Sequence, residues 1–534
     1  MNDKMKFLLP YWRKGIIPVV FLLISTIISF VYPLFPRWAI DNVVMQQRHD
    51  KLLYIAIIFL GLIILQRVFL YLNEVTFFKF QKKCILDIQQ KLLSKIFFYP
   101  MDFFDKNHSG YLMGRIRGDV TGLSYIFSQG LVLVVMDFIK FIGVIIIIFI
   151  LNVKLSLIIL TILPVIVIKI INSQKDIKEI NKHIIEENAR LEESLSDTLQ
   201  GIEVLKSFSK EKEGIERTGS ALKKYQKFEI KRTIILSKYN NIVDFIVHVG
   251  EVLFLYFGVQ EIVSGKLTIG SYIAFSGYLI FLYSPIKNIS QLFVFMDFAR
   301  RSYFRIKELF DILPEDSGEQ IIDEIKLIEI KDIYFDYDKK DNLIKGLTYK
   351  FNKGKKYVLT GVSGKGKSTL IKILLGLYRP KKGAVFYNDT NLKDINIKRL
   401  REKVGYISQN IFLFNKSLRE NIVFDNNIIS DKEIFQILKI CELDQKINQL
   451  KEGLNTIVSE KGANFSGGER QKIALSRALI KKPDLIILDE GTSNIDSVTE
   501  NKILKTIEEN FKDRIIIRIT HRNIQKEGWS EISL

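Results

Sequence analysis

Six nearly uninterrupted apolar stretches occupy the first half of the chain. They fall at 16–36, 52–72, 131–151, 155–171, 242–263 and 269–286. A helix needs about 20 mainly apolar residues to cross a bilayer, so these stretches are of membrane-spanning length or close to it. The pattern therefore predicts six transmembrane helices.

The links between these stretches alternate between short and long. The links 37–51, 152–154 and 264–268 are short, whereas the links after the second and fourth stretches are long and rich in Lys and Arg. Positive charge marks the cytoplasmic side of a membrane, so we expect the long links and both termini in the cytosol. The long links have helical periodicity, which predicts that the spans continue as helices beyond the membrane.

The pattern changes near Asp311, after which no stretch reaches membrane length. Pro314 and Gly318 indicate a linker. Short β-branched strands then alternate with helical patterns, which is typical of an α/β fold with a mostly parallel sheet. We therefore predict a multi-domain chain: a polytopic α-helical membrane domain at 1–310, a linker at 311–325 and an α/β domain at 326–534.

Composition agrees with this division. The 534 residues are 48% hydrophobic and 26% charged, which requires the apolar residues to be concentrated in blocks and excludes disorder, collagen and a disulfide scaffold. The two cysteines fit a reducing compartment. A net charge of +19 is open to two interpretations, nucleic-acid binding or basic cytoplasmic loops, and the apolar blocks favour the loops.

A phosphate-binding motif lies between a predicted strand ending at Thr360 and a predicted helix. The pattern G-x-x-x-x-G-K-[ST] is matched by Gly361, Val362, Ser363, Gly364, Lys365, Gly366, Lys367 and Ser368, followed by Thr369. Glycines let backbone N–H groups wrap phosphates, and the helix N-terminus adds a positive dipole end. We expect Lys367 to reach the β- and γ-phosphates and the Ser368 hydroxyl to bind Mg²⁺.

Two acidic residues end a later apolar strand, in the sequence Leu485-Ile486-Ile487-Leu488-Asp489-Glu490. Ligands of open α/β sheets bind at the carboxyl ends of the strands, so both acids are expected beside the phosphate motif. Asp489 suits the Mg²⁺ shell, and Glu490 suits a general base that polarises the attacking water.

With these motifs the second half of the chain resembles the ATP-binding cassette (ABC) family. Phe465-Ser466-Gly467-Gly468-Glu469 is similar to the family's signature, whose usual sequence is Leu-Ser-Gly-Gly-Gln. Phe465 and Glu469 are the two positions that differ from it. The other matching positions are Gln409 (glutamine loop), Ser493-Asn494-Ile495-Asp496 (D-loop), His521 (switch histidine) and Tyr337 (the aromatic that stacks on adenine). The resemblance implies catalytic roles for Gln409 and His521, a Mg²⁺ contact for Gln409, and nucleotide contacts for Tyr337, Ser466, Gly467, Gly468 and Asp496.

The first half resembles the six-helix exporter-type half-transporters of the same family. Phe103-Phe104-Asp105 with Gly110, Arg115 and Asp119 is similar to their first cytoplasmic loop, and Gly201-Ile202 is similar to their second. One departure is that only 13 positions follow His521, so the last elements of the cassette are expected to be shortened. Arg518 is also unusual in an otherwise apolar strand.

The resemblance implies an ATP-driven exporter with ATP and Mg²⁺ as cofactors. In this family each ATP site is shared by two cassettes, so this chain would need a second copy of itself or a related half-transporter. The implied location is the cytoplasmic membrane, and the Ile- and Lys-rich composition indicates a bacterial source. Alternatives are an ATP-gated or regulatory membrane protein that binds nucleotide without pumping, and a lipid or drug flippase.

One set of polar positions in the spans bears on the transported substrate. Asp244, His248 and Glu251 are spaced to lie on one face of the fifth span. Polar residues inside spans tend to face protein or water, so this face is a hypothetical cavity lining that would prefer cationic or amphipathic cargo. Interhelical pairing is the alternative. The segment Gly462-Ala463-Asn464, just before the signature, resembles the same segment of peptide and bacteriocin exporters, which makes a peptide one candidate substrate. We expect no peptidase domain before the first span.

Overall fold

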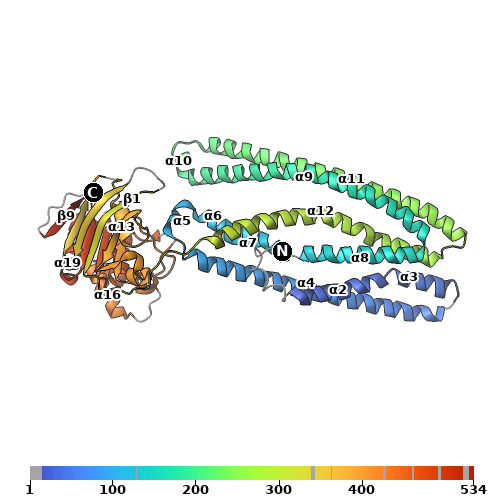
Figure 1. Cartoon of the computed structure of the whole chain (residues 1–534), viewed down its shortest axis with the longest axis horizontal. Helices are drawn as coiled ribbons and strands as arrows, with labels where there is room; N and C mark the ends of the chain where they lie inside the picture. Colours follow the sequence, from blue (N-terminus) through green and yellow to red (C-terminus); the bar gives the residue numbers. More distant parts are fainter. Residues whose placement is uncertain are drawn as a thin grey trace. The chain divides into compact units, whose positions relative to one another are not determined.

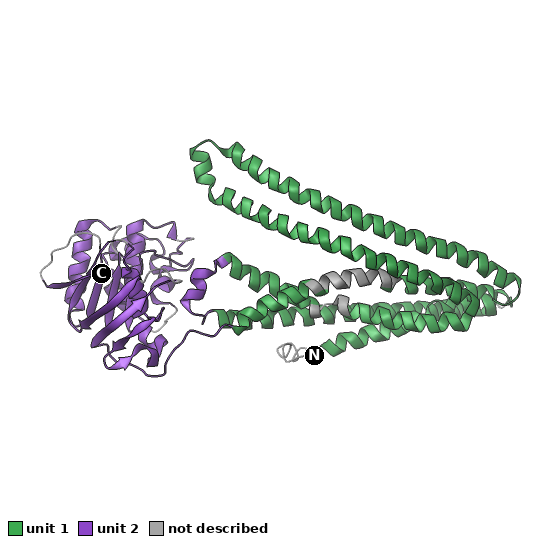
Figure 2. Cartoon of the chain, turned by 45° about the horizontal axis from the view of Figure 1, so that its top comes forward, with its two compact units in different colours: residues 1–96, 110–311 green, residues 97–109, 312–534 purple. Residues whose placement is uncertain are grey.

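The computed structural model of the chain describes residues 15–47, 49–127, 129–337, 343–362, 364–424, 429–459, 462–490, 495–520 and 528–534. These residues form two compact units (Figure 2). The helical unit comprises the described residues up to Ile96 together with Gly110–Asp311. The second unit, here called the cassette, comprises Phe97–Ser109 and Ile312–Leu534. The short segment Phe97–Ser109 therefore belongs to the cassette although it lies far from it in sequence.

Helices, several of them long, make up the helical unit (Figure 1). They are α2 (Ile16–Val31), α3 (Leu34–Ala39), α4 (Leu52–Ile96), α6 (Ser109–Met113), α7 (Val120–Leu123), α8 (Gln129–Leu151), α9 (Val153–Gln200), α10 (Ile202–Ser207), α11 (Glu211–Val263) and α12 (Ile269–Asp311). Two π-helical turns, Ile40–Val44 and Gly114–Asp119, interrupt the pattern.

The six predicted spans all fall in these helices. In the described part of the chain, five helical segments are long and apolar enough to cross a membrane. The sixth predicted span lies at the start of α12, where the described apolar segment is Ile269–Tyr283. The predicted continuation beyond the membrane is also present, because α11 has 53 residues. At 1.5 Å per residue this is about 80 Å, more than twice the thickness of a bilayer core.

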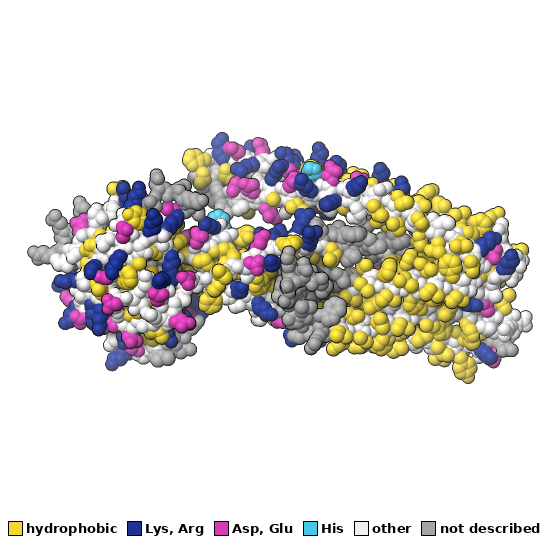
Figure 3. Space-filling view, in the orientation of Figure 1, with side chains coloured by type: hydrophobic (Ala, Val, Ile, Leu, Met, Phe, Trp, Pro, Cys, Tyr) yellow, Lys and Arg dark blue, Asp and Glu magenta, His cyan; other side chains and the backbone are white. Residues whose placement is uncertain are grey.

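The helical unit has its own core and an apolar surface. Val144, Ile159, Phe275 and Tyr278 are among its fully buried side chains. Figure 3 shows apolar side chains covering one end of the unit, while charged ones gather over the other parts of α9 and α11. A continuous apolar exterior is expected of helices that face lipid, where the solvent is as apolar as the side chains.

Two sheets form the frame of the cassette. The four-stranded antiparallel sheet has the order β2-β1-β4-β5, and the five-stranded parallel sheet has the order β6-β7-β8-β3-β9. The strands are β1 (Leu327–Phe335), β2 (Ile344–Asn352), β3 (Lys356–Thr360), β4 (Lys382–Tyr387), β5 (Thr390–Asn391), β6 (Val404–Ile407), β7 (Leu485–Asp489), β8 (Ile515–Ile519) and β9 (Trp529–Ser533). The parallel sheet was predicted, whereas the antiparallel sheet was not.

Helices cover the parallel sheet, whose central strands are buried on both faces. The cassette helices are α5 (Met101–Lys106), α13 (Lys367–Leu374), α14 (Ile397–Glu402), α15 (Leu418–Val423), α16 (Asp431–Ile440), α17 (Asp444–Gln449), α18 (Gly467–Leu479) and α19 (Ser497–Asn510). Burial on both faces explains why β7 and β8 are almost entirely apolar, because neither strand has a solvent-exposed face on which polar residues would be favoured.

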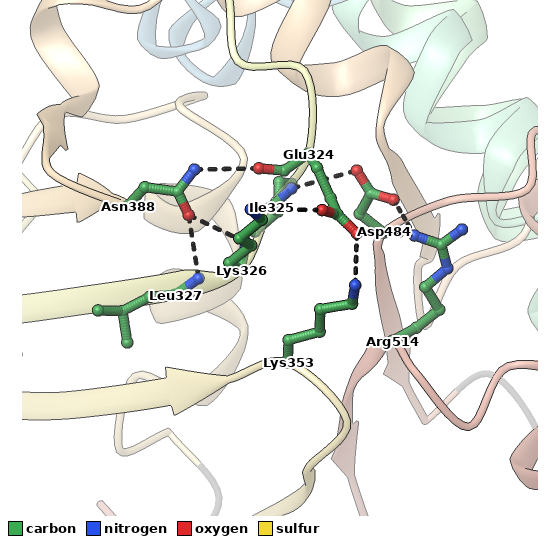
Figure 4. Close-up of polar contacts among 8 residues, drawn as sticks. All are labelled: Glu324, Ile325, Lys326, Leu327, Lys353, Asn388, Asp484 and Arg514. Atoms are coloured by element: carbon green, nitrogen blue, oxygen red, sulfur yellow. Dashed lines mark hydrogen bonds and ion pairs between the residues drawn. The ribbon is translucent and has the colours of Figure 1, made fainter.

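A polar junction joins the two sheets (Figure 4). The Asp484 carboxylate, just before β7, accepts from the backbone N–H of Ile325 and pairs with Arg514. The Asn388 side chain accepts from the N–H groups of Lys326 and Leu327 at 2.9 and 3.1 Å. These bonds satisfy backbone donors at the start of β1. The bond from Ile325 to Asp484 links this segment to the parallel sheet, whereas Asn388 belongs to the turn after the neighbouring strand β4.

Candidate nucleotide site

The phosphate motif forms the loop that its spacing predicts, between the end of β3 and the start of α13. Gly361, Gly364 and Gly366 adopt φ angles of +139°, +84° and +92°. Side-chain-bearing residues rarely adopt such angles, which explains why glycine is needed at these positions. Gly366 caps α13, so the first N–H groups of this helix are directed toward the loop. Ser363 lies outside the described residues.

Lys367 is folded back over its own loop. Its side chain is buried, and Nζ donates to the carbonyl oxygens of Gly361 at 2.7 Å and Val362 at 3.2 Å. A buried ammonium held by carbonyl dipoles is a positive charge in a low-dielectric setting, which favours an anionic ligand. Lys365, by contrast, is exposed.

Ser368 and Asp489 are brought together across 121 residues of sequence. The Ser368 hydroxyl donates to Asp489 Oδ1 at 3.3 Å, and Asp489 is only 3% exposed. Burial raises the pKa of the Asp489 carboxyl, with the hydrogen bond from Ser368 opposing that shift. A hydroxyl and a buried carboxylate are oxygen donors of the kind that Mg²⁺ prefers, so the pair fits this cation.

Gln409 and Glu490 form a second pair at the same sheet edge. Gln409 Nε2 donates to Glu490 Oε2 at 2.7 Å, which leaves the amide oxygen of Gln409 able to accept from or coordinate another group. Glu490 itself has φ = +50°, an unusual angle for a residue with a side chain. Such strained positions cluster at functional sites, because only the surrounding structure holds them in place.

Tyr337 lies next to the phosphate loop and beside a cavity. Its hydroxyl is 3.2 Å from Thr369 Oγ1, and its ring meets the ring of Tyr378 edge-on at 5.3 Å. The cavity, of about 430 Å³, is lined by both tyrosines, by Arg379 and by residues of the α5 segment such as Asp102. An aromatic ring at the wall of a cavity next to a phosphate loop is suitably placed to contact a nucleotide base.

The signature residues form a capped helix start. Ser466 is the N-cap of α18 and accepts from the Glu469 N–H, while the Glu469 carboxylate accepts from the Ser466 N–H. This reciprocal capping box needs Glu or Gln at the fourth position, so Glu469 is a conservative departure from the usual glutamine. Gly467 and Gly468 form the first turn of α18. Asp496 is the N-cap of α19 and accepts from the Thr499 N–H.

The site residues thus form two groups. Within the described part of one chain, no hydrogen bond or ion pair joins Ser466 or Asp496 to the phosphate loop. His521 and the D-loop positions Ser493 and Asn494 lie outside the described residues.

Three further features were missed from the sequence: Tyr378 beside Tyr337, Tyr406 beside Asp489, and a buried ion pair between Arg518 of β8 and Glu500 of α19. Only Arg518 gave a sequence signal, as a charge in an apolar strand.

The predicted substrate residues lie on α11. His248 Nδ1 is 2.9 Å from Glu251 Oε2, and their side chains are 71% and 55% exposed. Asp244 is half-buried on the same helix. The structure places His248 and Glu251 in contact, and a role of this face in substrate binding stays a prediction.

Comparisons with known proteins identify the family. A sequence profile of the ABC transporter transmembrane region matches residues 16–286, and the ABC transporter profile matches residues 344–493. The chain therefore belongs to the ABC transporter family, as a membrane protein with a transmembrane domain fused to an ATP-binding ATPase domain.

Individual relatives agree with this assignment. ABC transporter B family member 1 of Dictyostelium discoideum is 30% identical over 83% of this chain, which spans about half (49%) of that protein. A putative export ATP-binding/permease protein of Rickettsia typhi is 29% identical over 83% of this chain and 77% of its own length. A bacterial Atm1-family ABC exporter with ATP bound has the same fold, with a TM-score of 0.82 at 21% identity over 96% of this chain and 91% of that one.

Proposed function

We propose that the chain is a half-transporter that uses ATP to export a cationic or amphipathic substrate across the cytoplasmic membrane of a bacterium. The observation that carries this proposal is the meeting of two pairs, Ser368 with Asp489 and Gln409 with Glu490, at the sheet edge beside the phosphate loop. Four residues from three separated motifs converge there, as hydrolysis of a phosphate anhydride requires.

Each group has a role in this chemistry. Lys367 and the loop N–H groups bind the phosphates, and Ser368, Gln409 and Asp489 would hold Mg²⁺ through oxygen atoms. The bound cation would neutralise charge on the phosphates. Glu490 orients the attacking water and accepts its proton, and Gln409 holds the Glu490 carboxylate in place through the 2.7 Å hydrogen bond.

The site requires a second cassette. Ser466, Gly468 and Asp496 are nucleotide-site residues by resemblance, yet Ser466 and Asp496 have no bond to the phosphate loop of their own chain among the described residues. In our proposal the second cassette supplies these groups, and it comes from another copy of this chain or from a related half-transporter. ATP favours the paired state only to the extent that it binds that state better than the separated one.

The cargo proposal rests on exposure inside a span. Charged side chains that face lipid are costly, so residues such as Glu251, whose side chain is 55% exposed on a membrane helix, need a partner chain or a water-filled cavity. In this proposal Asp244 and Glu251 line the transport cavity, where they would create a negative potential that selects cationic cargo, including basic peptides. The His248 ring beside Glu251 would weaken that potential when protonated.

The test of the ATPase compares the wild type with Glu490→Gln in lipid nanodiscs. We expect the variant to retain ATP binding and to lose hydrolysis at least about a hundredfold, since it removes the general base. Lys367→Ala is the matched control that should lose binding as well. Normal hydrolysis by the Glu490→Gln variant would show that the base is wrongly assigned.

The test of the cargo face uses the double variant Asp244→Asn, Glu251→Gln. We expect basal hydrolysis to remain and the stimulation by cationic peptides or amphiphiles to fall. Glu216→Gln, which removes an exposed carboxylate elsewhere on α11, is the control and should leave stimulation unchanged. Stimulation that survives in the double variant would remove the cargo proposal. Wild-type hydrolysis without any cargo flux would favour a nucleotide-gated role.

A further inference from the structure

A large cavity lies at the end of the helical unit where the short link 37–51 joins α3 to α4. Its volume is about 910 Å³, and its walls come from the end of α2, from α3 with the following π-helical turn, and from the start of α4. Neither the nucleotide site nor the α11 face uses it. Short links face the outside of the cell in the predicted topology, so this outer cavity opens at the outer membrane surface.

The wall of the outer cavity changes from apolar to aromatic and then to charged side chains. Val31, Ile55 and Ile58 line its apolar part, and Val31 and Ile58 are 37% and 58% exposed on spans that face lipid. Trp38 and Tyr54 come next and are 47% and 70% exposed. Exposed Trp and Tyr mark the boundary between hydrocarbon and headgroups, so the cavity straddles the membrane interface.

The polar rim of the outer cavity carries both signs of charge: Arg37, Lys51, Asp41 and Asp50. The Asp41 carboxylate is already engaged, since it accepts from the Gly270 N–H at 3.0 Å and from Thr268 Oγ1 at 2.7 Å. Asp50 and Lys51 are exposed in the 3-10 turn His49–Lys51, just before α4 begins. The rim thus offers one exposed anion and one exposed cation at neighbouring sequence positions, with Arg37 as a second cation.

We propose that the outer cavity binds a zwitterionic phospholipid with an amine headgroup, of the phosphatidylethanolamine type, from the surrounding bilayer. The acyl chains would lie against the apolar part, the phosphate would face Lys51 and Arg37, and the ammonium would face Asp50 and the aromatic rings. The depth profile favours a lipid over a water-soluble ligand, and the paired rim charges favour a zwitterion over an anionic lipid. The π-helical turn in the wall is also a kind of element that recurs at functional sites.

Occupation of the outer cavity would act on the contact between α3 and α12. A Cβ atom at Gly270 would lie 2.5 Å from the Arg37 carbonyl oxygen, so the two backbones are in close contact there. Arg37 Nε is 3.8 Å from Asp41, whose carboxylate holds the first turn of α12. A lipid phosphate on Arg37 would therefore change the electrostatic surroundings of the carboxylate that holds the start of α12.

Trp38 provides a direct probe of the occupant. The chain has three tryptophans, and Trp12→Phe leaves Trp38 with Trp529, which gives a constant background from β9. The protein is placed in nanodiscs that contain phosphatidylethanolamine or phosphatidylglycerol with identical brominated acyl chains, since bromine quenches tryptophan on contact. We expect phosphatidylethanolamine to quench Trp38 at several-fold lower mole fraction. Equal quenching by the two lipids, or none by either, would overturn the proposal.

Two rim variants test the contributions of Asp50 and Lys51 to lipid binding separately. Two controls test whether any tryptophan or any lost surface charge would give the same result. Asp50→Asn should reduce the preference for phosphatidylethanolamine about two- to fivefold, which is the range for one exposed charge pair. Lys51→Gln should weaken both lipids similarly, because both carry the phosphate. A tryptophan moved to the lipid-exposed position 64 (Trp38→Phe with Ile64→Trp) should show no headgroup preference, and Lys182→Gln should change nothing. An unchanged preference in Asp50→Asn would contradict the assignment.

Discussion

The buried ion pair between Arg518 and Glu500 gives a sharp test of how the cassette is held together. Their side chains are 4% and 7% exposed and form an ion pair between β8 and α19. Arg518→Met fills a similar volume but leaves the Glu500 carboxylate buried without this counter-charge. Breaking one side of a buried pair costs about 3–5 kcal/mol. For a unit of this size, about 1 kcal/mol lowers Tm by about 2–4 °C, so the expected drop is about 6–20 °C.

The assay is thermal unfolding of the purified full chain carrying Trp12→Phe and Trp38→Phe, followed by the fluorescence of Trp529 in β9. The double variant Arg518→Met, Glu500→Met removes both charges and should recover most of the lost stability, because two apolar side chains can replace a buried pair at little cost. The ion-pair argument is refuted if Arg518→Met lowers Tm no more than the double variant does. Arg514→Met, at a more exposed arginine, should cost less.

Three further predictions follow from local geometry. Gly122→Ala should lower the Tm of the helical unit, because a Cβ atom there would lie 2.2 Å from Ser302 Oγ and overpacking costs about 1–3 kcal/mol. Gly118→Ala is the control and should be neutral, because a Cβ atom at position 118 meets open space. Differential scanning calorimetry compares the two variants. Ser466→Ala removes the α18 capping box and should lower the cassette Tm by about 2–4 °C, for a loss of about 1 kcal/mol. The pKa of Asp496 is lowered by a backbone N–H of α19, so its stabilising effect is complete at neutral pH and is lost as pH falls through that lowered pKa. The Tm difference between wild type and Asp496→Leu should therefore shrink in acid, and a constant difference from pH 7 to pH 3 would contradict this.

Local pattern predicted some parts of the molecule well. The apolar stretches located the spans because a membrane helix must be apolar over its whole length, and the phosphate loop was found because its glycines need unusual φ angles. The antiparallel sheet was missed, since its strands are mixed in polarity and β1 pairs with β4, which is remote from it in sequence. The α5 segment belongs to the cassette unit, which the residue pattern of that segment does not predict.

The sequence by itself determined the membrane helices, the phosphate loop and the family, because these depend on residue types at short and fixed spacing. Only the tertiary structure decided which residues meet. Ser368 reaches Asp489, and Gln409 reaches Glu490, because parallel strands bring their carboxyl ends to one edge of the sheet. It likewise decided that Arg518 has a buried partner in Glu500 and that a cavity opens beside Trp38. Such contacts depend on how distant elements pack, which local periodicity does not specify.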